Sequence, residues 1–510
     1  MKLNIKKSLI FLFLILLLGG FLRLYKLGQQ SFIADEYLGI NASYGYYKTG
    51  QWKFWDFNKE ELTDQNYTRA KIYYWQVAQI FNFLPASEAN ARLVSVVWGM
   101  IGIISIFVAS YLVTRNYWIA LLAALLMSVS VSSLMYDRKL RMYSMFVPIF
   151  LWFNYAVFYF LESKTSKRIP FLSNLSEKTG LNWIWIPAVV FLGAVSYLTH
   201  SLSVNIIAPI VFFLILMMLI GYKKNKKVDM KYLVSFLGVI LMIIFAVNLD
   251  RLESHLIFFS WGINNWSYLE KVTLDYSHML LAGVFFLIGC SYLIKHRSKI
   301  GLWTVVSYLS ILFLAIMCWK RSAGHQYILL TQSFKIIIMA SGIYFSAKIL
   351  SEKVFSGSKK WFLGLIALFL VLLINFSFFF SKDSFYAEIT KWNHSNYREI
   401  FSYYLRHRED NSAVITRPAT NFYLWGTNTD IIGYNENEEE LTLEKVRSAQ
   451  ENYDDVWVVF SSTMYIKGEA RKYIRENFEK LETKYTNDEL DLWRWRRTAA
   501  NNDKLQMNKN

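Results

Sequence analysis

Hydrophobic residues are gathered into long blocks over the first 380 positions of the chain. Several blocks exceed the length of about 18 apolar residues at which a helix can cross a bilayer. The pattern therefore predicts a polytopic α-helical membrane protein with about eleven transmembrane helices. They are expected near residues 8–25, 93–113, 118–134, 142–161, 183–199, 202–221, 232–249, 276–294, 301–319, 328–347 and 361–380.

The first block, MKLNIKKSLIFLFLILLLGG, has the basic start and the apolar run of a signal peptide. No cleavage site of the A-x-A type follows it, because Gly19 and Gly20 lead directly into FLRLYKLG. We therefore expect an uncleaved first span.

After about residue 380 the pattern changes to short alternating segments. The runs AVITR, DIIGY, DVWVVFSS and ELDLWRWRR are rich in β-branched and aromatic residues and predict strands. The runs YREIFSYYLRHRED, LTLEKVRSAQENY and KGEARKYIRENFEKLE have helical spacing. The alternation predicts a small α/β domain over residues 381–497 and a disordered tail over 498–510. No Gly-rich nucleotide loop is present, so no cofactor is indicated.

Residues 1–380 are expected to form one transmembrane domain that includes a long first external loop, residues 26–92. The segment KIYYWQVAQIFNFL in this loop has apolar residues at helical spacing and predicts a helix at the membrane surface. A later external loop contains LIFFSWGINNWSYL, which is expected to lie at the same kind of interface.

The net charge of +17 is unevenly distributed. Residues 381–510 contain 19 Lys and Arg against 22 Asp and Glu, so the first 380 residues carry the whole positive excess. Loops such as YKKNKKVDMK and KHRSK would be cytoplasmic if the N-terminus is cytoplasmic, as the positive-inside rule requires. The charge therefore indicates an integral plasma (inner) membrane protein with an extracytoplasmic C-terminal domain. Nucleic acid is not an expected partner.

Two adjacent carboxylates, Asp35 and Glu36, follow the first span in the segment SFIADEYLGI. One interpretation places them in the first turn of a surface helix, where carboxylates favour the positive end of the helix dipole. The other is general base catalysis, because an ionised carboxylate can accept the proton of an attacking hydroxyl group. The sequence is compatible with both interpretations, and catalysis by these carboxylates is the more specific hypothesis.

Cations also occur at the predicted external ends of the spans, where orientation alone would not put them. In LMYDRKLRMYSMF, Arg138 and Arg141 are three residues apart and share a face if helical. They either snorkel or pair with Asp137, or they bind a phosphate. The other candidates on this side are His200 in YLTHSLSV, and Lys320, Arg321, His325, Gln326 and Tyr327 in CWKRSAGHQYILLTQ. No His, Cys or Asp spacing specifies a metal site.

These segments together resemble the GT-C superfamily of membrane glycosyltransferases, in its protein O-mannosyltransferase and aminoarabinose-transferase-like branch. The segments with this resemblance are FLRLYKLGQQSFIADEYLGINASYGY, SEANARLVSVVWGMIGI, YDRKLRMYSMFVPIF and YLTHSLSVNIIAP. They cover roughly residues 10–210, and the later spans resemble the family in architecture alone. The family's His-Pro-Pro-like stretch is replaced here by YTRAKIYYW.

The resemblance implies transfer of a sugar from a polyprenyl-phosphate-linked donor to an acceptor hydroxyl at the extracytoplasmic face. The enzyme would be a hexosyl- or pentosyltransferase, with Asp35 as the base and Glu36 as a supporting catalytic residue. The residues expected at the donor phosphate are Arg138, Arg141, Lys320 and Arg321, and those expected to bind substrate are Arg92, Tyr136, His200, His325 and Tyr327. The expected partners are the lipid-linked donor, a lipid, glycan or protein acceptor, and the bilayer. A divalent metal ion at Glu36 is left open.

Three alternatives use some of the same features. A transporter or flippase of lipid-linked sugars would need ionisable groups along a path through the bilayer. A polysaccharide polymerase or ligase would use the same carriers. A catalytically inactive membrane scaffold could keep the same residues. The Asp-Glu pair directly after the first span favours the transferase.

Overall fold

The computed structural model describes residues 5–164, 170–247, 260–273, 275–320, 324–354, 361–375, 396–433, 440–460, 466–483 and 490–498. The predicted tail at 498–510 lies outside these residues apart from Thr498. The chain divides into two compact units, each built from segments that are distant in the sequence. The first unit comprises Met1–Tyr25, Arg69–Tyr73 and Leu93–Ile389, and the second comprises Lys26–Thr68, Tyr74–Arg92 and Thr390–Asn510.

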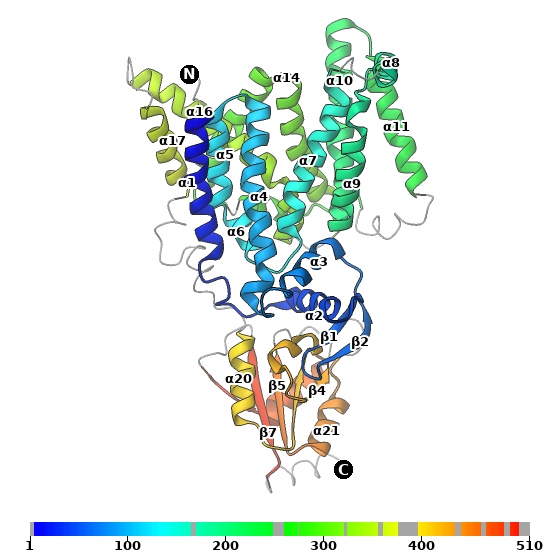
Figure 1. The fold of residues 1–510 in the computed structure, drawn as a ribbon, viewed down its shortest axis with the longest axis vertical. Helices are drawn as coiled ribbons and strands as arrows, with labels where there is room; N and C mark the ends of the chain where they lie inside the picture. Colours follow the sequence, from blue (N-terminus) through cyan, green and yellow to red (C-terminus); the bar gives the residue numbers. More distant parts are fainter. Residues whose placement is uncertain are drawn as a thin grey trace. The chain divides into compact units, whose positions relative to one another are not determined.

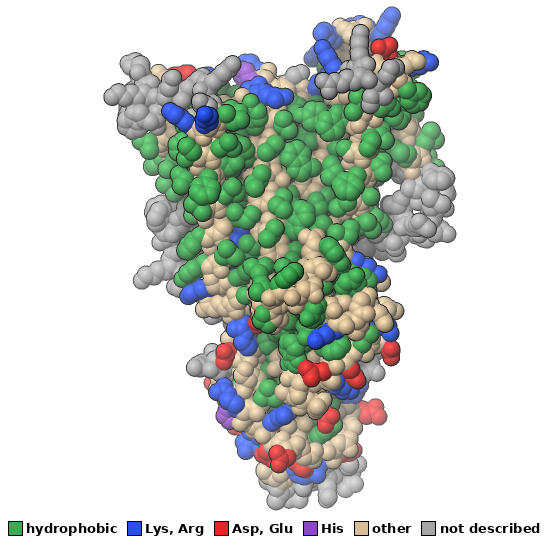
Figure 2. All heavy atoms as spheres, in the orientation of Figure 1, with side chains coloured by type: hydrophobic (Ala, Val, Ile, Leu, Met, Phe, Trp, Pro, Cys, Tyr) green, Lys and Arg blue, Asp and Glu red, His purple; other side chains and the backbone are tan. Residues whose placement is uncertain are grey.

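The first unit is helical. Its elements are α1 (Ile5–Leu24), most of α4 (Glu88–Thr114), α5 (Tyr117–Val129), α6 (Val131–Asp137), α7 (Tyr143–Glu162), α8 (Pro170–Thr179), η1 (Trp183–Trp185), α9 (Ile186–Thr199), η2 (Ser201–Ile206), α10 (Ile207–Asn225), α11 (Met230–Val247), α13 (Ser267–Thr273), α14 (Met279–Cys318), α15 (His325–Ile328), η3 (Leu329–Thr331), α16 (Gln332–Val354) and α17 (Trp361–Ile374). The long helices run side by side (Figure 1). Hydrophobic side chains cover the visible face of this bundle, and Lys and Arg gather at the end that holds α8 and the N-terminus of α1 (Figure 2).

Each predicted span falls on a helix of this unit. Among the described residues, seven helices are long and apolar enough to cross a membrane, or nine if each of two bent pairs is one span. The chain is therefore an integral membrane protein, while the count of eleven stays a prediction. The expected loop KHRSK lies where the stretch labelled α14 (Met279–Cys318) reverses direction. It divides the two candidate spans Met279–Arg297 and Lys299–Cys318, and the rings of Phe286 and Tyr308 on either side of it lie 5.1 Å apart.

Helices α16 and α14 pack unusually closely. A glycine on each helix lies against the backbone of the other helix. A Cβ atom on Gly289 of α14 would collide with the Ile338 carbonyl, and a Cβ atom on Gly342 of α16 would collide with the Phe285 carbonyl. Small residues let helices approach in a membrane, where packing rather than water exclusion drives association. Helix α16 is accordingly the most enclosed span, with 89% of its apolar window buried, against 17% for α1.

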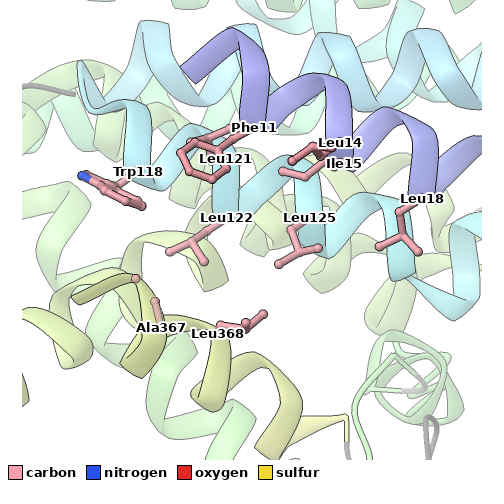
Figure 3. Close-up of a pocket in the computed structure, with 11 residues that line it drawn as sticks. Phe11, Leu14, Ile15, Leu18, Trp118, Leu121, Leu122, Leu125, Ala367 and Leu368 are labelled. Atoms are coloured by element: carbon pink, nitrogen blue, oxygen red, sulfur yellow. The ribbon is translucent and has the colours of Figure 1, made fainter. Parts of the chain in front are cut away.

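A shallow apolar groove of about 290 Å³ lies among α1, α5 and α17 (Figure 3). Leu14, Leu122 and Leu368 are typical of its lining, which has no charged residue. An apolar surface of this kind packs best against hydrocarbon, such as lipid acyl chains.

The second unit combines residues from the first external loop with the C-terminal region. Its elements are α2 (Ala34–Thr49), β1 (Lys53–Asp56), β2 (Glu61–Asn66), most of α3 (Lys71–Ile80), α20 (Tyr397–His407), β3 (Ser412–Thr416), η4 (Pro418–Leu424), β4 (Asp430–Gly433), α21 (Leu443–Asn452), β5 (Asp455–Phe460), α22 (Gly468–Asn477), β6 (Glu479–Lys480) and β7 (Asp491–Arg496). Strands β1 and β2 form an antiparallel hairpin. The sequence-based strands and helices after residue 396 are confirmed, and β6 and the hairpin were not anticipated.

A five-stranded sheet in the order β4-β3-β5-β7-β6 forms the centre of the C-terminal part. Strands β3, β4 and β5 are parallel, and β7 is antiparallel to β5. Side chains alternate along a strand, so the two faces of β5 differ. Val456 and Val458 pack with residues of α21 and α22, whereas the Trp457 ring meets Tyr404 of α20 edge-on at 5.5 Å. Helices therefore cover both faces of the sheet.

The close approach of α14 and α16 yields a testable difference between two glycines of α14. Gly289→Ala places a methyl group against the Ile338 backbone, and such overpacking costs about 1–3 kcal/mol. Gly283→Ala is the matched control, since no atom lies within 4 Å of its added Cβ and alanine is the better helix former by about 1 kcal/mol. Thermal unfolding of the detergent-purified protein should show a lower Tm for Gly289→Ala alone. Equal Tm values for both variants would contradict the close packing.

Candidate functional site

The two adjacent carboxylates lie in the first turn of α2 and have opposite environments. Successive helical residues point about 100° apart, so Asp35 and Glu36 cannot face the same way. Asp35 is exposed, while Glu36 is 1% exposed. The Ile33 backbone N–H donates to Glu36 Oε2 at 3.2 Å, which ties the helix start to this carboxylate.

Glu36 forms a two-point ion pair with Arg92 of α4. Arg92 Nε donates to Oε1 at 2.9 Å and Nη2 donates to Oε2 at 2.8 Å. The guanidinium also donates to three backbone carbonyls of the preceding loop, those of Leu27, Gln30 and Ser31, at 2.9–3.1 Å. Arg92 is 2% exposed, so this pair is held in a low-dielectric interior where both charges need each other. The pair fixes the loop that leads into α2 and, with it, the position of Asp35.

In the first unit, Arg138 supports the end of α1. Its Nη1 donates to the carbonyls of Leu22, Arg23 and Tyr25 at 2.8–2.9 Å. These belong to the last turn and exit of α1, where carbonyls lack partners within the helix. The neighbouring Asp137 pairs with Arg23 at 2.7 Å. Arg138 is thus largely engaged by the protein itself, and its role at a phosphate stays a prediction.

A group of cations, histidines and tyrosines meets around residues 136–143. We name it the basic aromatic cluster and define it as Tyr136, Lys139, Arg141, Tyr143, His200 and His325. The Tyr136 and Tyr143 rings lie 5.3 Å apart, with Lys139 Nζ 5.6 Å from the first ring and the Arg141 guanidinium 5.4 Å from the second. The His325 ring stacks on Tyr136 at 5.8 Å, and the His200 ring is 5.1 Å from Tyr143.

Neighbouring side chains hold this cluster in place. Ser95 of α4 donates its hydroxyl to the Lys139 carbonyl at 2.6 Å, which fixes the turn that carries the two cations. The Tyr136 hydroxyl donates to Gln326 Oε1 at 3.0 Å. His200 Nδ1 accepts the Leu202 backbone N–H at 3.0 Å and so begins η2. Two cations beside polarisable rings and two imidazoles suit an anionic ligand.

The structure therefore brings the predicted residues into two groups, one in each unit. Glu36 and Arg92 meet in the second unit, and Tyr136, Arg141, His200 and His325 meet in the first. Lys320 is exposed and Tyr327 half-buried, while Arg321 lies outside the described residues. Two residues of the first group were not predicted: Tyr143, and Ser132, whose hydroxyl lies 2.9 Å from His325 Nε2. The aromatic run after Arg141 was a usable signal for Tyr143, but nothing in the sequence singled out Ser132.

Metal binding at Glu36 has no geometric support within the described part of the chain. Both of its carboxylate oxygens accept hydrogen bonds from Arg92. No group of three or more His, Cys, Asp or Glu in that part is arranged to hold a metal ion.

Comparison with known proteins gives the fold. No family model and no curated protein sequence matches the chain. The crystal structure of ArnT from Cupriavidus metallidurans bound to undecaprenyl phosphate matches it with a TM-score of 0.55 at 11% identity, over 96% of this chain and 98% of that one. The oligosaccharyltransferase AglB from Archaeoglobus fulgidus, in complex with an inhibitory peptide and a dolichol-phosphate, matches with a TM-score of 0.59 at 9% identity, over 94% and 74%. Both are GT-C glycosyltransferases, so the predicted GT-C fold is confirmed.

The different environments of the two carboxylates predict losses of stability of very different size. Glu36→Gln leaves the Arg92 charge buried without a counter-ion, which costs about 3–5 kcal/mol. Asp35→Asn, the adjacent control, changes an exposed group and should cost less than about 1 kcal/mol. Thermal unfolding and hydrogen exchange over residues 27–36 measure both. Similar losses in the two variants would contradict the role of the ion pair.

Proposed function

We propose that this chain is a membrane glycosyltransferase that moves a sugar from a polyprenyl-phosphate-linked donor to an acceptor hydroxyl group. The observation that carries the proposal is the fold, shared over 96% of the chain with a structure solved with undecaprenyl phosphate. A fold alone hosts several functions, so the proposal also requires residues able to do the chemistry. Asp35 and the basic aromatic cluster supply them.

Asp35 is proposed as the general base. It is exposed in the first turn of α2, directly after the loop that the Glu36–Arg92 pair fixes, and a carboxylate in that setting can accept a proton from a bound hydroxyl. The acceptor oxygen would then form a bond to the anomeric carbon of the sugar as the bond between that carbon and the phosphate oxygen breaks. The products are the glycosylated acceptor and the free polyprenyl phosphate.

Arg141 and Lys139 are proposed to bind the carrier phosphate. Leaving-group charge grows on the phosphate as the bond breaks, and preorganised cations stabilise that charge better than water does. Arg138 would support them by fixing the chain between α6 and Arg141, in addition to any contact with the phosphate. Lys320 and Arg321 are further cations for this role by sequence position.

The orientation in the membrane belongs to the same proposal. The Lys- and Arg-rich loops favour a cytoplasmic N-terminus in the plasma (inner) membrane, with the α/β domain and the transfer reaction on the extracytoplasmic side. The acceptor would reach Asp35 from the aqueous side, and the donor would arrive in the bilayer. The sugar and the acceptor class, whether lipid, glycan or protein, would be set by contacts around these groups.

The base assignment predicts that Asp35→Asn abolishes transfer while the protein still folds and still binds the donor carrier. General base catalysis contributes about 10²–10⁴-fold, so the rate should fall by at least about 100-fold. Transfer of radiolabelled sugar from membrane-extracted lipid donors to acceptor fractions is the readout, with Tm as the folding control. Full transfer by Asp35→Asn would reject the base.

The phosphate assignment predicts a loss of carrier affinity in Arg141→Ala. Losing one charge-assisted contact to a phosphate should weaken binding of undecaprenyl phosphate by about tenfold or more. Arg115→Ala is the matched control, because Arg115 is exposed and also faces a tyrosine ring, that of Tyr111 at 6.0 Å. Native mass spectrometry of detergent-purified variants measures the retained lipid. Equal retention by both variants would contradict the assignment.

A further inference from the structure

A buried ion pair lies at the junction of four segments of the first unit. Asp275, which precedes α14, pairs with Lys335 of α16 at 2.6 Å, and the side chains are 3% and 5% exposed. Lys335 Nζ also donates to the Val272 carbonyl at 2.8 Å. A lysine within an apolar span is costly unless it has a partner, and Asp275 is that partner.

Asp275 also holds the break between α5 and α6. Its Oδ1 accepts the Ser132 backbone N–H at 2.9 Å and the Ser130 hydroxyl at 3.0 Å, and its Oδ2 accepts Gln332 Nε2 at 2.7 Å. Burial alone would raise the pKa of Asp275, but the Lys335 ammonium and the hydrogen bonds from Ser132 and Gln332 hold it well below its usual range. The carboxylate is therefore ionised at neutral pH. The two helices bend by 57° at this point.

The same break presents Ser132 to His325. Ser132 Oγ lies 2.9 Å from His325 Nε2, and the imidazole is stacked on the Tyr136 ring with 12° between their planes. The other ring nitrogen, Nδ1, is buried and makes no hydrogen bond within the described residues. A buried polar nitrogen of this kind costs free energy unless a ligand atom satisfies it.

We propose that Asp275 is a positioning residue that acts through Ser132 to hold His325 with Nδ1–H directed at an anionic ligand oxygen. The inference rests on the proposed function, because the ligand is then the phosphate of the polyprenyl carrier. An ionised phosphate oxygen only accepts hydrogen bonds, so a neutral His325 must carry its proton on Nδ1. Nε2 must then accept the Ser132 hydroxyl, and Asp275 fixes that serine through its backbone N–H. His325 thereby joins Arg141 and Lys139 as a donor to the phosphate.

The positioning step is tested without any lipid, by the ¹⁵N spectrum of histidine-labelled full-length protein in nanodiscs. Comparison with His325→Asn identifies the His325 signals. The wild type should show a protonated Nδ1 and an unprotonated Nε2. Ser132→Ala and Asp275→Asn should shift both signals toward a mixture of tautomers. Ser133→Ala, which removes a neighbouring buried hydroxyl whose contact is the Met127 sulfur, should leave them unchanged.

Asp275→Asn breaks the ion pair with Lys335 and could therefore prevent folding. Ser132→Ala leaves that pair intact, so it tests the positioning of His325 even if Asp275→Asn does not fold. An Nε2-protonated His325 in the wild type would overturn the proposal. Unchanged signals in Ser132→Ala would overturn it as well.

The ligand step is tested with undecaprenyl phosphate and two substitutions that each keep one nitrogen. An asparagine amide can replace Nδ1, and a glutamine amide can replace Nε2. His325→Gln should therefore lose about tenfold or more in affinity for undecaprenyl phosphate, and His325→Asn clearly less. Neither should change binding of undecaprenol, which has no phosphate.

The two failures can be told apart. The reverse order of affinities, or equal losses, would overturn the assignment of Nδ1 to the ligand. If the folded wild type binds no undecaprenyl phosphate, the carrier proposal fails and the assignment of Nδ1 to the phosphate fails with it. The ¹⁵N spectrum then still decides whether Asp275 positions His325.

Discussion

The ion pair between Glu36 and Arg92 is the interaction on which the proposed reaction depends. A guanidinium buried to this extent must find both a counter-charge and acceptors for its remaining hydrogens. Arg92 finds the charge in Glu36 and the acceptors in the carbonyls of the loop before α2. The pair thus fixes the start of α2, where the adjacent carboxylate, Asp35, is exposed. A base needs such a fixed position because proton transfer requires hydrogen-bond contact with the acceptor hydroxyl.

Buried cations of the first unit likewise donate hydrogen bonds to backbone carbonyls and so hold neighbouring segments in place. Arg138 satisfies the last carbonyls of α1, and Lys335 joins Asp275 beneath the α5–α6 break. The cations that contact rings, Lys139 and Arg141, are less buried than Arg138. The smaller burial of Arg141, together with the three backbone carbonyls that Arg138 binds, is the reason that Arg141 is proposed as the main phosphate ligand.

Much of the fold could be predicted from the sequence because its determinants are local. Long apolar runs dictate spans, and short β-branched runs such as DVWVVFSS dictate buried strands. The environments of Asp35 and Glu36 could not be predicted, because they depend on Arg92, which lies 56 positions from Glu36. The Asp275–Lys335 pair joins residues 60 positions apart, and the only local sign was a lysine inside the predicted span at 328–347. The packing of the first external loop with the C-terminal sheet region into one unit likewise left no local pattern.

Native mass spectrometry of the wild-type protein with a panel of polyprenyl-phosphate sugars tests the central claim most directly. The account predicts that the protein retains one of these lipids selectively. On addition of an acceptor-containing membrane fraction, the retained mass should fall by one sugar residue, which leaves polyprenyl phosphate on the protein. A folded protein that retains none of the lipids, or that retains one without losing the sugar in the presence of any acceptor fraction, would contradict the assignment as a glycosyltransferase.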